Sequence, residues 1–301
     1  MSKPLFILCP GQGAQAVGMG KALCESSETA RKVFKTAADV LGYDLSAICF
    51  EGPEARLNQT DISQPAIYVA SIASFRHAAE SGMFDTAAVT AYAGLSLGEY
   101  TALHLAGVFG FEEGLKLVAL RGQYMQEAAV ATPSSMVALI GADEKQVDEL
   151  CDKARGADVL VPANYNAPGQ IVVSGSSSAC QRVLAEAEKA GIRAMALKVA
   201  GAFHSPLMQP AADRMRMELA KVEIHPPKKP VYSNVTAKLH SDADHIRELL
   251  VKQIVSPVRW EQTMQTLVAT PDAKFIELSP GRTLAGLAKR INRRLAVESL
   301  G

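Results

Sequence analysis

The stretch Gly94-Leu95-Ser96-Leu97-Gly98-Glu99-Tyr100 lies between an apolar run at 88–93 and a stretch from Thr101 that has the composition of a helix. Strand, Gly-x-Ser-x-Gly and helix is the layout of a nucleophile elbow, whose tight turn strains the serine and exposes its hydroxyl in a cleft. The two glycines remove the Cβ atoms that would clash in such a turn. The alternative is a helix that happens to start with glycine and serine. The strand and helix on either side favour the elbow.

The bulk composition is that of an ordinary globular protein. The chain has 301 residues, 48% hydrophobic and 21% charged, and its 31 Lys and Arg side chains balance 31 Asp and Glu. A chain of this length forms one large domain or two lobes. Because the net charge is zero, we expect no nucleic-acid partner that depends on a basic field.

The cysteines and apolar runs indicate a reducing compartment and no membrane contact. Five scattered cysteines without Cys-x-x-Cys spacing fit buried thiols better than disulfides or a zinc site. The apolar run at 5–9 is too short for a signal peptide, and no run is long enough to cross a membrane. The histidines lack metal-ligand spacing, so we expect no metal. These features predict a cytoplasmic location.

A second, smaller lobe is indicated from residue 131. Strand and helix signals there follow the order βαββαβ, which is typical of a ferredoxin-like unit. Asp143 with Gln146 three residues later forms a variant of the capping box at its first helix. The sequence therefore predicts an α/β protein in which residues 131–199 form an inserted small lobe, and residues 1–130 and 200–301 form a larger catalytic lobe.

Three segments carry polar residues that are candidates for a reaction centre. The loop after the apolar run at 5–9 either brings the amide of Gln12 or Gln15 to the site or is a plain turn. Arg121, among the apolar residues of a helix predicted at 111–129, either faces an anion or lies on the surface. His204 follows a strand end, where catalytic groups tend to lie, or is a structural histidine.

The remaining elements are expected from local signals. The sequence predicts a strand at 230–235, a helix at 246–255 and a last strand at 275–278, followed by a helix from Leu284. Pro65 is expected near the first turn of another helix, where proline is tolerated.

Together these segments resemble the malonyl-CoA:acyl-carrier-protein transacylases of fatty-acid synthesis over nearly the full length. Each motif is modest alone, but their order and spacing are very specific. The resemblance implies an α/β-hydrolase-like large lobe with a ferredoxin-like insert. The motifs are Pro10-Gly11-Gln12-Gly13-x-Gln15, Gly94-x-Ser96-Leu97-Gly98-Glu99-Tyr100, Arg121-Gly122, Asn166-x-Pro168-Gly169-Gln170, Phe203-His204-Ser205-Pro206-Leu207-Met208, Ser233-Asn234-Val235, Gln253-x-x-x-Pro257-Val258-x-Trp260 and Ser279-Pro280-Gly281.

The resemblance implies a catalytic role for four of these residues. Ser96 would be the nucleophile, and His204 would be the base that takes its proton and returns it to the leaving thiol. The backbone N–H groups of Gln12 and Leu97 would form the oxyanion hole.

It also implies how the substrate is held. Arg121 would bind the malonyl carboxylate as a two-pronged ion pair. In this family the backbone carbonyl at the position of Gln253, and not an acid, orients the histidine. Phe203 and Asn166 are further candidates for the substrate pocket.

The implied reaction is ping-pong transfer of malonyl from malonyl-CoA, through Ser96, to the phosphopantetheine thiol of acyl carrier protein. Exchange of one thioester for another is close to thermoneutral, so no cofactor, ATP or metal is required. The site must exclude water, because water would hydrolyse the acyl-serine.

Two details bear on this expectation. Leu95 departs from the family pattern, which usually has histidine before the nucleophile, so no neighbouring histidine can replace His204. Ala202-Phe203-His204 resembles the form found in malonyl-selective acyltransferases. The bulky Phe203 beside the base predicts a preference for malonyl over methylmalonyl groups.

Two other classes remain as alternatives. A serine hydrolase would use the same elbow, but it has no need of a buried arginine facing Ser96. A non-catalytic module that binds a carrier protein would not need Ser96, His204, Arg121 and Gln12 together.

The expected carrier protein is acidic, which makes basic residues near the cleft candidates for its docking. The candidates are Lys189, Arg193, Lys198 and Arg290. We expect a monomer, because neither a coiled-coil seam nor a long exposed apolar stripe is evident.

Overall fold

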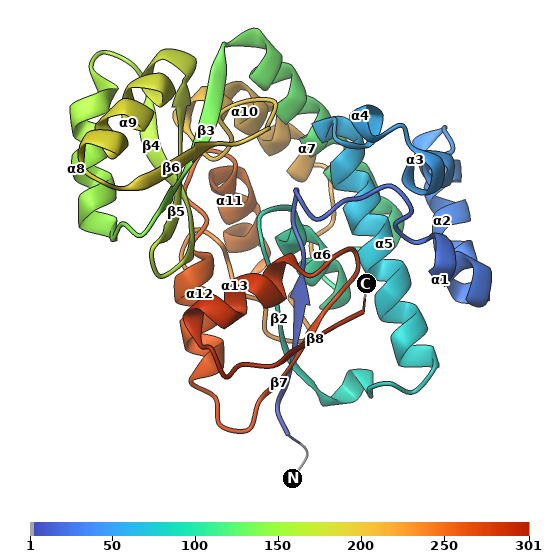
Figure 1. Ribbon diagram of the computed structural model, residues 1–301. Helices are drawn as coiled ribbons and strands as arrows, with labels where there is room; N and C mark the ends of the chain where they lie inside the picture. Colours follow the sequence, from blue (N-terminus) through green and yellow to red (C-terminus); the bar gives the residue numbers. More distant parts are fainter. Residues whose placement is uncertain (1–2, 301) are drawn as a thin grey trace.

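The computed structural model describes residues 3–300 and contains two four-stranded sheets (Figure 1). Positions 1, 2 and 301, which belong to the predicted larger lobe, lie outside the described residues. The first sheet has the strand order β2-β1-β7-β8, and all its neighbouring strands are parallel. Its strands are β1 (Leu5–Cys9), β2 (Val89–Gly94), β7 (Lys274–Glu277) and β8 (Val297–Ser299).

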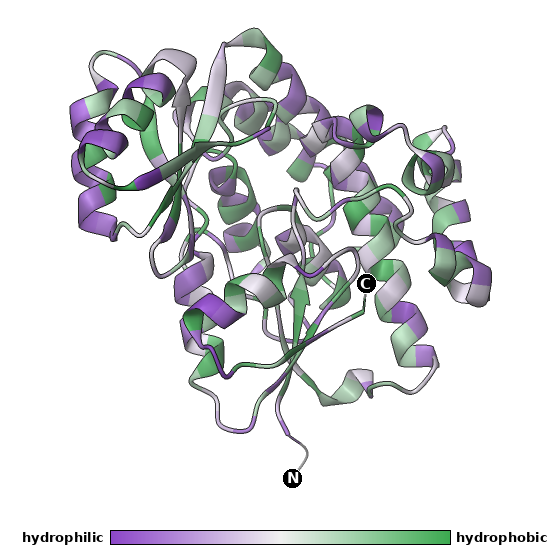
Figure 2. Ribbon diagram, viewed as in Figure 1, coloured by the Kyte–Doolittle hydropathy of each residue, from purple (hydrophilic) through white to green (hydrophobic). Residues whose placement is uncertain are grey.

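Helices cover both faces of this parallel sheet, as the fully buried β1 strand requires. Alternate residues of β1 enter two different cores. Ile7 packs into the larger core, together with residues of helices that lie between residues 21 and 253. Leu8 packs into a second core with residues from α12 (Trp260–Val268) and α13 (Thr283–Ile291). Figure 2 shows hydrophobic residues concentrated in these central strands. The fold is therefore a helix-covered parallel sheet, as predicted.

The helices of the larger lobe lie before and after the small lobe in the chain. No helix among residues 3–300 is long and apolar enough to cross a membrane. The helices are α1 (Lys21–Ser26), α2 (Glu28–Leu41), α3 (Leu45–Glu51), α4 (Glu54–Leu57), α5 (Thr60–Glu80), α6 (Leu97–Leu105), α7 (Phe111–Ala131), α10 (Gln209–Leu219), α11 (Ala243–Gln253), α12 (Trp260–Val268) and α13 (Thr283–Ile291), with short 3₁₀ turns at Thr86–Ala88 and Pro206–Met208.

The second sheet confirms the ferredoxin-like order. Its strands pair antiparallel in the order β4-β5-β3-β6, and two helices pack on it around a separate core. The capping box is present, since Asp143 Oδ1 accepts from the Gln146 N–H at 2.8 Å and Gln146 Oε1 accepts from the Asp143 N–H at 3.0 Å. The exact lobe boundaries remain a prediction. The elements are β3 (Ser134–Ile140), α8 (Glu144–Arg155), β4 (Leu160–Ala167), β5 (Gln170–Ser176), α9 (Ser177–Lys189) and β6 (Arg193–Ala196).

Three local predictions were wrong. The segment 230–235 makes only isolated bridges, because the chain turns back after Tyr232 and the Ser233 N–H donates to the Lys238 carbonyl. The strand at 274–277 is not the last, since β8 adds to the same sheet after α13. Pro65 lies inside α5 and not at its first turn. That helix begins at Thr60, whose N–H donates to the side chain of Gln126 on α7.

Candidate active site

The turn after β2 has the geometry of a nucleophile elbow. Ser96 has φ 52° and ψ −105°, a strained conformation for a residue with a side chain, and α6 begins at Leu97. A Cβ atom on Gly94 would lie 1.9 Å from the Gly98 carbonyl carbon, and one on Gly98 would lie 2.1 Å from the Cys9 oxygen. Both glycines are therefore required by close backbone contacts, which confirms the predicted elbow.

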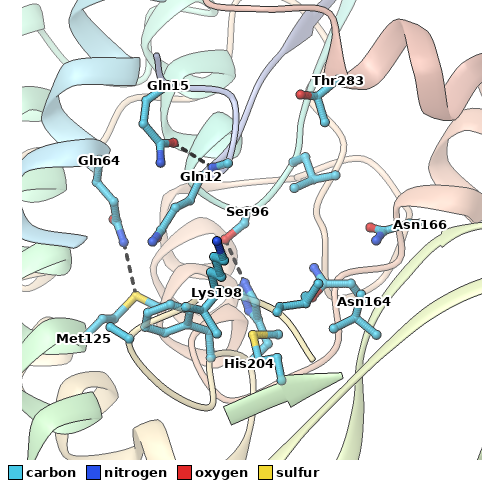
Figure 3. A pocket seen from close by; sticks show the side chains of 18 of the residues that line it. Gln12, Gln15, Gln64, Ser96, Met125, Asn164, Asn166, Lys198, His204 and Thr283 are labelled. Atoms are coloured by element: carbon cyan, nitrogen blue, oxygen red, sulfur yellow. Dashed lines mark hydrogen bonds between the residues drawn. The ribbon is translucent and has the colours of Figure 1, made fainter. Parts of the chain in front are cut away.

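Ser96 opens into a cavity of about 330 Å³ between the two sheets. In Figure 3 its hydroxyl faces His204, while Gln12 and Gln15 approach from the loop after β1. Asn166 and Lys198 come from the small-lobe side of the same cavity. The predicted site residues that line the cavity are Gln12, Gln15, Ser96, Arg121, Asn166, Lys198, Phe203 and His204.

His204 bridges Ser96 and the main chain of α11. The Ser96 hydroxyl lies 2.8 Å from His204 Nε2, and His204 Nδ1 lies 2.8 Å from the carbonyl oxygen of Gln253. Because a carbonyl oxygen only accepts, Nδ1 carries the proton, and Nε2 of the neutral ring is free to accept from Ser96. Burial, together with the positive charge of Arg121, lowers the pKa of His204 to about 4. The ring is therefore a neutral acceptor at physiological pH.

Arg121 is buried, so the surface alternative for this residue was wrong. Its side chain is 1% exposed, and its guanidinium reaches the serine directly. Nη2 donates to Ser96 Oγ at 3.1 Å and to Gln253 Oε1 at 2.9 Å. Its partners are neutral oxygens, and among residues 3–300 no carboxylate forms an ion pair with it. A buried cation of this kind favours an anionic ligand.

Two backbone N–H groups beside Ser96 have no acceptor within the described part of the chain. Leu97 is the first residue of α6, so its N–H has no partner in the helix. The N–H of Gln12, in the loop after β1, also donates to no protein group. An oxyanion hole requires free backbone donors, so Gln12 and Leu97 remain the candidates for it.

Two further residues, which the sequence did not predict, support the site. Gln64 Oε1 accepts from Arg121 Nη1 at 2.6 Å, and Asn234 Oδ1 accepts from the Ser96 N–H at 2.6 Å. Gln64 lies in α5, whose residues from Ile62 to Phe75 are all buried. The presence of a glutamine in such a buried helix was the sequence signal that could have identified Gln64. Asn234 belonged to a quoted motif, but no local pattern linked it to the elbow.

Leu95 lines the cavity at the position where the family usually has histidine. It is half-buried and packs against the core shared by α12 and α13. Thr283 and Leu287 of α13 line the cavity with it. Leu95 therefore contributes an apolar wall and no hydrogen-bonding group.

The remaining sequence expectations concern cysteines, metals and basic residues. The five cysteines are buried and free of disulfides, as expected. Residues 3–300 contain no group of three or more His, Cys, Asp or Glu side chains arranged to hold a metal. Of the four basic candidates for carrier docking, Lys198 lines the cavity. Lys189 instead pairs with Glu186 on the exposed face of α9.

Comparison with known proteins agrees with this architecture. The family model of the acyl transferase domain matches residues 6–296. The malonyl CoA-acyl carrier protein transacylase of Bacillus subtilis is 41% identical over 297 residues, which cover 98% of this chain and 92% of that protein. The solved transacylase of the same name from Coxiella burnetii superposes with a TM-score of 0.95 at 41% identity, covering 99% of this chain and 94% of that one.

A third relative was solved with a partner. It is a malonyl-transacylase in complex with a type II PKS acyl-carrier protein, 39% identical, with a TM-score of 0.94 and coverage of 98% of this chain and 95% of that one. The fold and its buried serine–histidine site are those of an acyltransferase. The chain belongs to the malonyl CoA-acyl carrier protein transacylase family.

Proposed function

We propose that this enzyme transfers a malonyl group from malonyl-CoA to the phosphopantetheine thiol of acyl carrier protein, and so supplies fatty-acid or polyketide synthesis. The observation that supports the proposal is that a histidine and an arginine both contact the hydroxyl oxygen of Ser96. Ser96 Oγ lies 2.8 Å from His204 Nε2 and 3.1 Å from Arg121 Nη2. A nucleophile, a neutral base and a cation for the substrate acid thus meet in one buried site.

The first half-reaction acylates Ser96. Its hydroxyl attacks the thioester carbonyl of malonyl-CoA while its proton passes to His204 Nε2. The N–H groups of Gln12 and Leu97 donate to the oxygen that becomes negative. When the tetrahedral intermediate collapses, the carbon–sulfur bond breaks and the CoA thiolate takes the proton from His204. The Gln253 carbonyl stabilises the imidazolium through Nδ1–H in both steps.

The second half-reaction reverses the same path with a different thiol. His204 removes the proton of the phosphopantetheine thiol, and the thiolate attacks the malonyl ester. Ser96 leaves and takes the proton back from His204. No cofactor or metal takes part, since the thioester bond is conserved.

Selectivity for an acid-bearing acyl group follows from Arg121. On substrate binding, its guanidinium would turn from Ser96 Oγ to the malonyl carboxylate, which offers two charged acceptors. Phe203 is 6% exposed and lines the cavity, as does Asn166, so both would contact the acyl group or the pantetheine arm. A serine hydrolase for neutral esters has no use for this buried cation.

We further propose the following setting for the reaction. The partners are malonyl-CoA and acyl carrier protein, with no nucleic-acid or membrane partner, and the enzyme is a cytoplasmic monomer. Residues 131–199 would form the inserted lobe and residues 1–130 and 200–301 the catalytic lobe. Lys198 at the cavity is the best-placed of the basic residues for an acidic carrier.

The test is malonyl transfer to a purified carrier protein. Mixing the enzyme with malonyl-CoA should add one malonyl mass to the peptide containing Ser96, and added holo carrier protein should remove it. Acetyl-CoA and methylmalonyl-CoA serve as comparisons. An adduct that persists in Ser96→Ala contradicts the assigned nucleophile, and loss of the adduct to water rather than to the carrier supports the hydrolase.

A further inference from the structure

Glu99 is a buried carboxylate that joins three distant segments behind the elbow. It lies in α6 three residues after Ser96, and its exposure is 0%. It accepts from the Asn234 N–H at 2.9 Å, from Gln253 Nε2 at 2.6 Å and from His240 Nε2 at 2.7 Å. The mechanism above makes no use of this group, although burying a carboxylate is costly.

Two of these partners reach the reacting groups. Asn234 Oδ1 accepts from the Ser96 N–H at 2.6 Å, and its Nδ2 donates to the Gly94 carbonyl at 2.7 Å. Gln253 Nε2 also donates to the Ser96 carbonyl at 3.0 Å. The main-chain carbonyl of Gln253 accepts from His204. Glu99 therefore fixes both the strained serine and the residue that orients the base.

The same carboxylate is a counter-charge that hydrogen bonds connect to Arg121. Arg121 Nη2 donates to Gln253 Oε1 at 2.9 Å, and Gln253 Nε2 donates to Glu99 Oε2 at 2.6 Å. One amide thus links the cation to the anion. Burial lowers the pKa of Arg121, whereas Glu99 is among the groups that raise it. A buried cation needs such compensation, because an isolated charge in the interior is strongly destabilising.

The intervening amide has a functional consequence. A carboxylate bonded directly to Arg121 would occupy the donors that the substrate acid needs. A carboxylate one amide away stabilises the cation without using those donors. The guanidinium N–H groups can then release their neutral acceptors and bind the substrate carboxylate. Resting on the proposed function, we propose that Glu99 is a positioning residue that balances the charge of Arg121 through Gln253 and thereby sets how tightly an acid-bearing acyl group is held.

Glu99→Gln removes the negative charge of the side chain while keeping its shape. Its Oε1 can accept from Asn234 and Gln253. Its amide can donate to His240 Nε2 in the other ring tautomer, because His240 Nδ1 has no partner among residues 3–300. We expect the KM for malonyl-CoA to fall about tenfold, the size expected for unit charges roughly 10 Å apart in a protein. The turnover number should fall as well, because the acyl carboxylate is held more tightly. The KM for acetyl-CoA should change less than about twofold.

A double-mutant cycle tests the connection to Arg121. Glu99→Gln should lower the folding equilibrium constant by at least about tenfold when Arg121 is present. In the Arg121→Met background, which lacks the positive charge, Glu99→Gln should lower the folding equilibrium constant by less than about threefold. Equal destabilisation in both backgrounds, with an unchanged malonyl-CoA KM, would show that Glu99 is only a hydrogen-bonding group.

Two further variants keep the test decisive. Glu277→Gln is the matched control, because Glu277 is equally buried but accepts from the N–H groups of Leu284 and Ala285 at the start of α13. It should lose stability without changing the malonyl-CoA KM.

Glu99→Asp retains the charge and shortens the side chain, so its malonyl-CoA KM should stay within about twofold of wild type even if Glu99→Gln fails to fold. A tenfold fall in Glu99→Asp overturns the proposal. Absence of a malonyl adduct in the wild-type protein refutes the proposed function instead.

Discussion

The Nδ1–H of His204 donates to the main-chain carbonyl of Gln253 at 2.8 Å, where many serine–histidine sites have a carboxylate. A carbonyl oxygen sets the ring tautomer as a carboxylate does, but it adds no negative charge to stabilise the protonated ring. Burial and the positive charge of Arg121 lower the pKa of His204 to about 4, and the hydrogen bond to Gln253 offsets only part of that shift. His204 is therefore neutral at pH 7 and can accept the proton of Ser96.

The pH dependence of acylation should report this low pKa. His204 is an effective base only when neutral, so the rate of CoA release in the first turnover should be level from about pH 5.5 to 8 and should halve near pH 4. Stopped-flow detection of the free CoA thiol measures the rate. An inflection near pH 6.5, the value for an exposed histidine, would contradict the assignment.

Arg121→Ala should separate malonyl from acetyl transfer. Loss of the buried ion pair with the substrate acid is expected to cost about 2–5 kcal/mol, or roughly 30-fold to several thousand-fold in kcat/KM for malonyl-CoA. Acetyl-CoA lacks the carboxylate, and its kcat/KM should change by less than about tenfold. Both are measured as transfer to the carrier protein. An unchanged ratio of the two would refute the role of Arg121.

Phe203→Leu should relax selectivity against branched acyl groups. The shorter side chain opens space in the cavity beside His204 while remaining apolar. We expect the ratio of methylmalonyl to malonyl transfer to rise by roughly tenfold. This agrees with the discrimination of about 1–3 kcal/mol that an apolar pocket makes for one methyl group. Competition between the two CoA esters, read by mass spectrometry of the carrier, gives the ratio. If the wild-type enzyme uses both esters equally, the predicted preference is wrong.

Gly98→Ala should disrupt the elbow. The added Cβ would lie 2.1 Å from the backbone oxygen of Cys9, and no flexible side chain can move to relieve that contact. We expect destabilisation of more than about 3 kcal/mol together with loss of the Ser96 adduct. Gly286→Ala in α13 is the control, since its Cβ would meet nothing within 4 Å. Its stability in urea should be unchanged or higher by up to about 1 kcal/mol.

Two histidines, the buried His204 and the half-buried His104, should make the fold sensitive to mild acid. Burial lowers the pKa of His104 to about 4, as it does for His204, whereas unfolding returns each to about 6.5. The unfolded chain therefore binds more protons between these values, so the free energy of unfolding falls as the pH drops from about 6.5 to about 4. Each histidine should contribute about 2 kcal/mol of loss between pH 7 and pH 5.

His104→Gln isolates one of these contributions. His104 makes its hydrogen bond to the Phe109 carbonyl, away from the cavity, so the variant can be compared without changing the site. Denaturant unfolding at pH 7 and pH 5 should show a smaller acid-induced loss in the variant, by about 2 kcal/mol. The same loss in both proteins would rule out His104 as a source of acid sensitivity.

Features that depend only on neighbouring residues could be predicted from the amino-acid sequence. The glycines around Ser96 specified the elbow, because a tight turn excludes side chains locally. The alternation of strand and helix signals from residue 131 specified the βαββαβ lobe, and Asp143 with Gln146 specified a helix start. The motif resemblance identified the family.

Which polar groups share the site depends on how distant segments pack together. Gln64, Asn234 and Glu99 meet Arg121, Ser96 and Gln253 across separations of 57, 138 and 154 residues. No local periodicity encodes such contacts, because they arise when the ends of β1 and β2 and helices α5, α7 and α11 are packed together. Burial also decided the chemistry of Arg121 and His204. In the sequence each was an ordinary polar residue. Exclusion of water made Arg121 a buried cation, with no ion-pair partner among the described residues, and made His204 a neutral base.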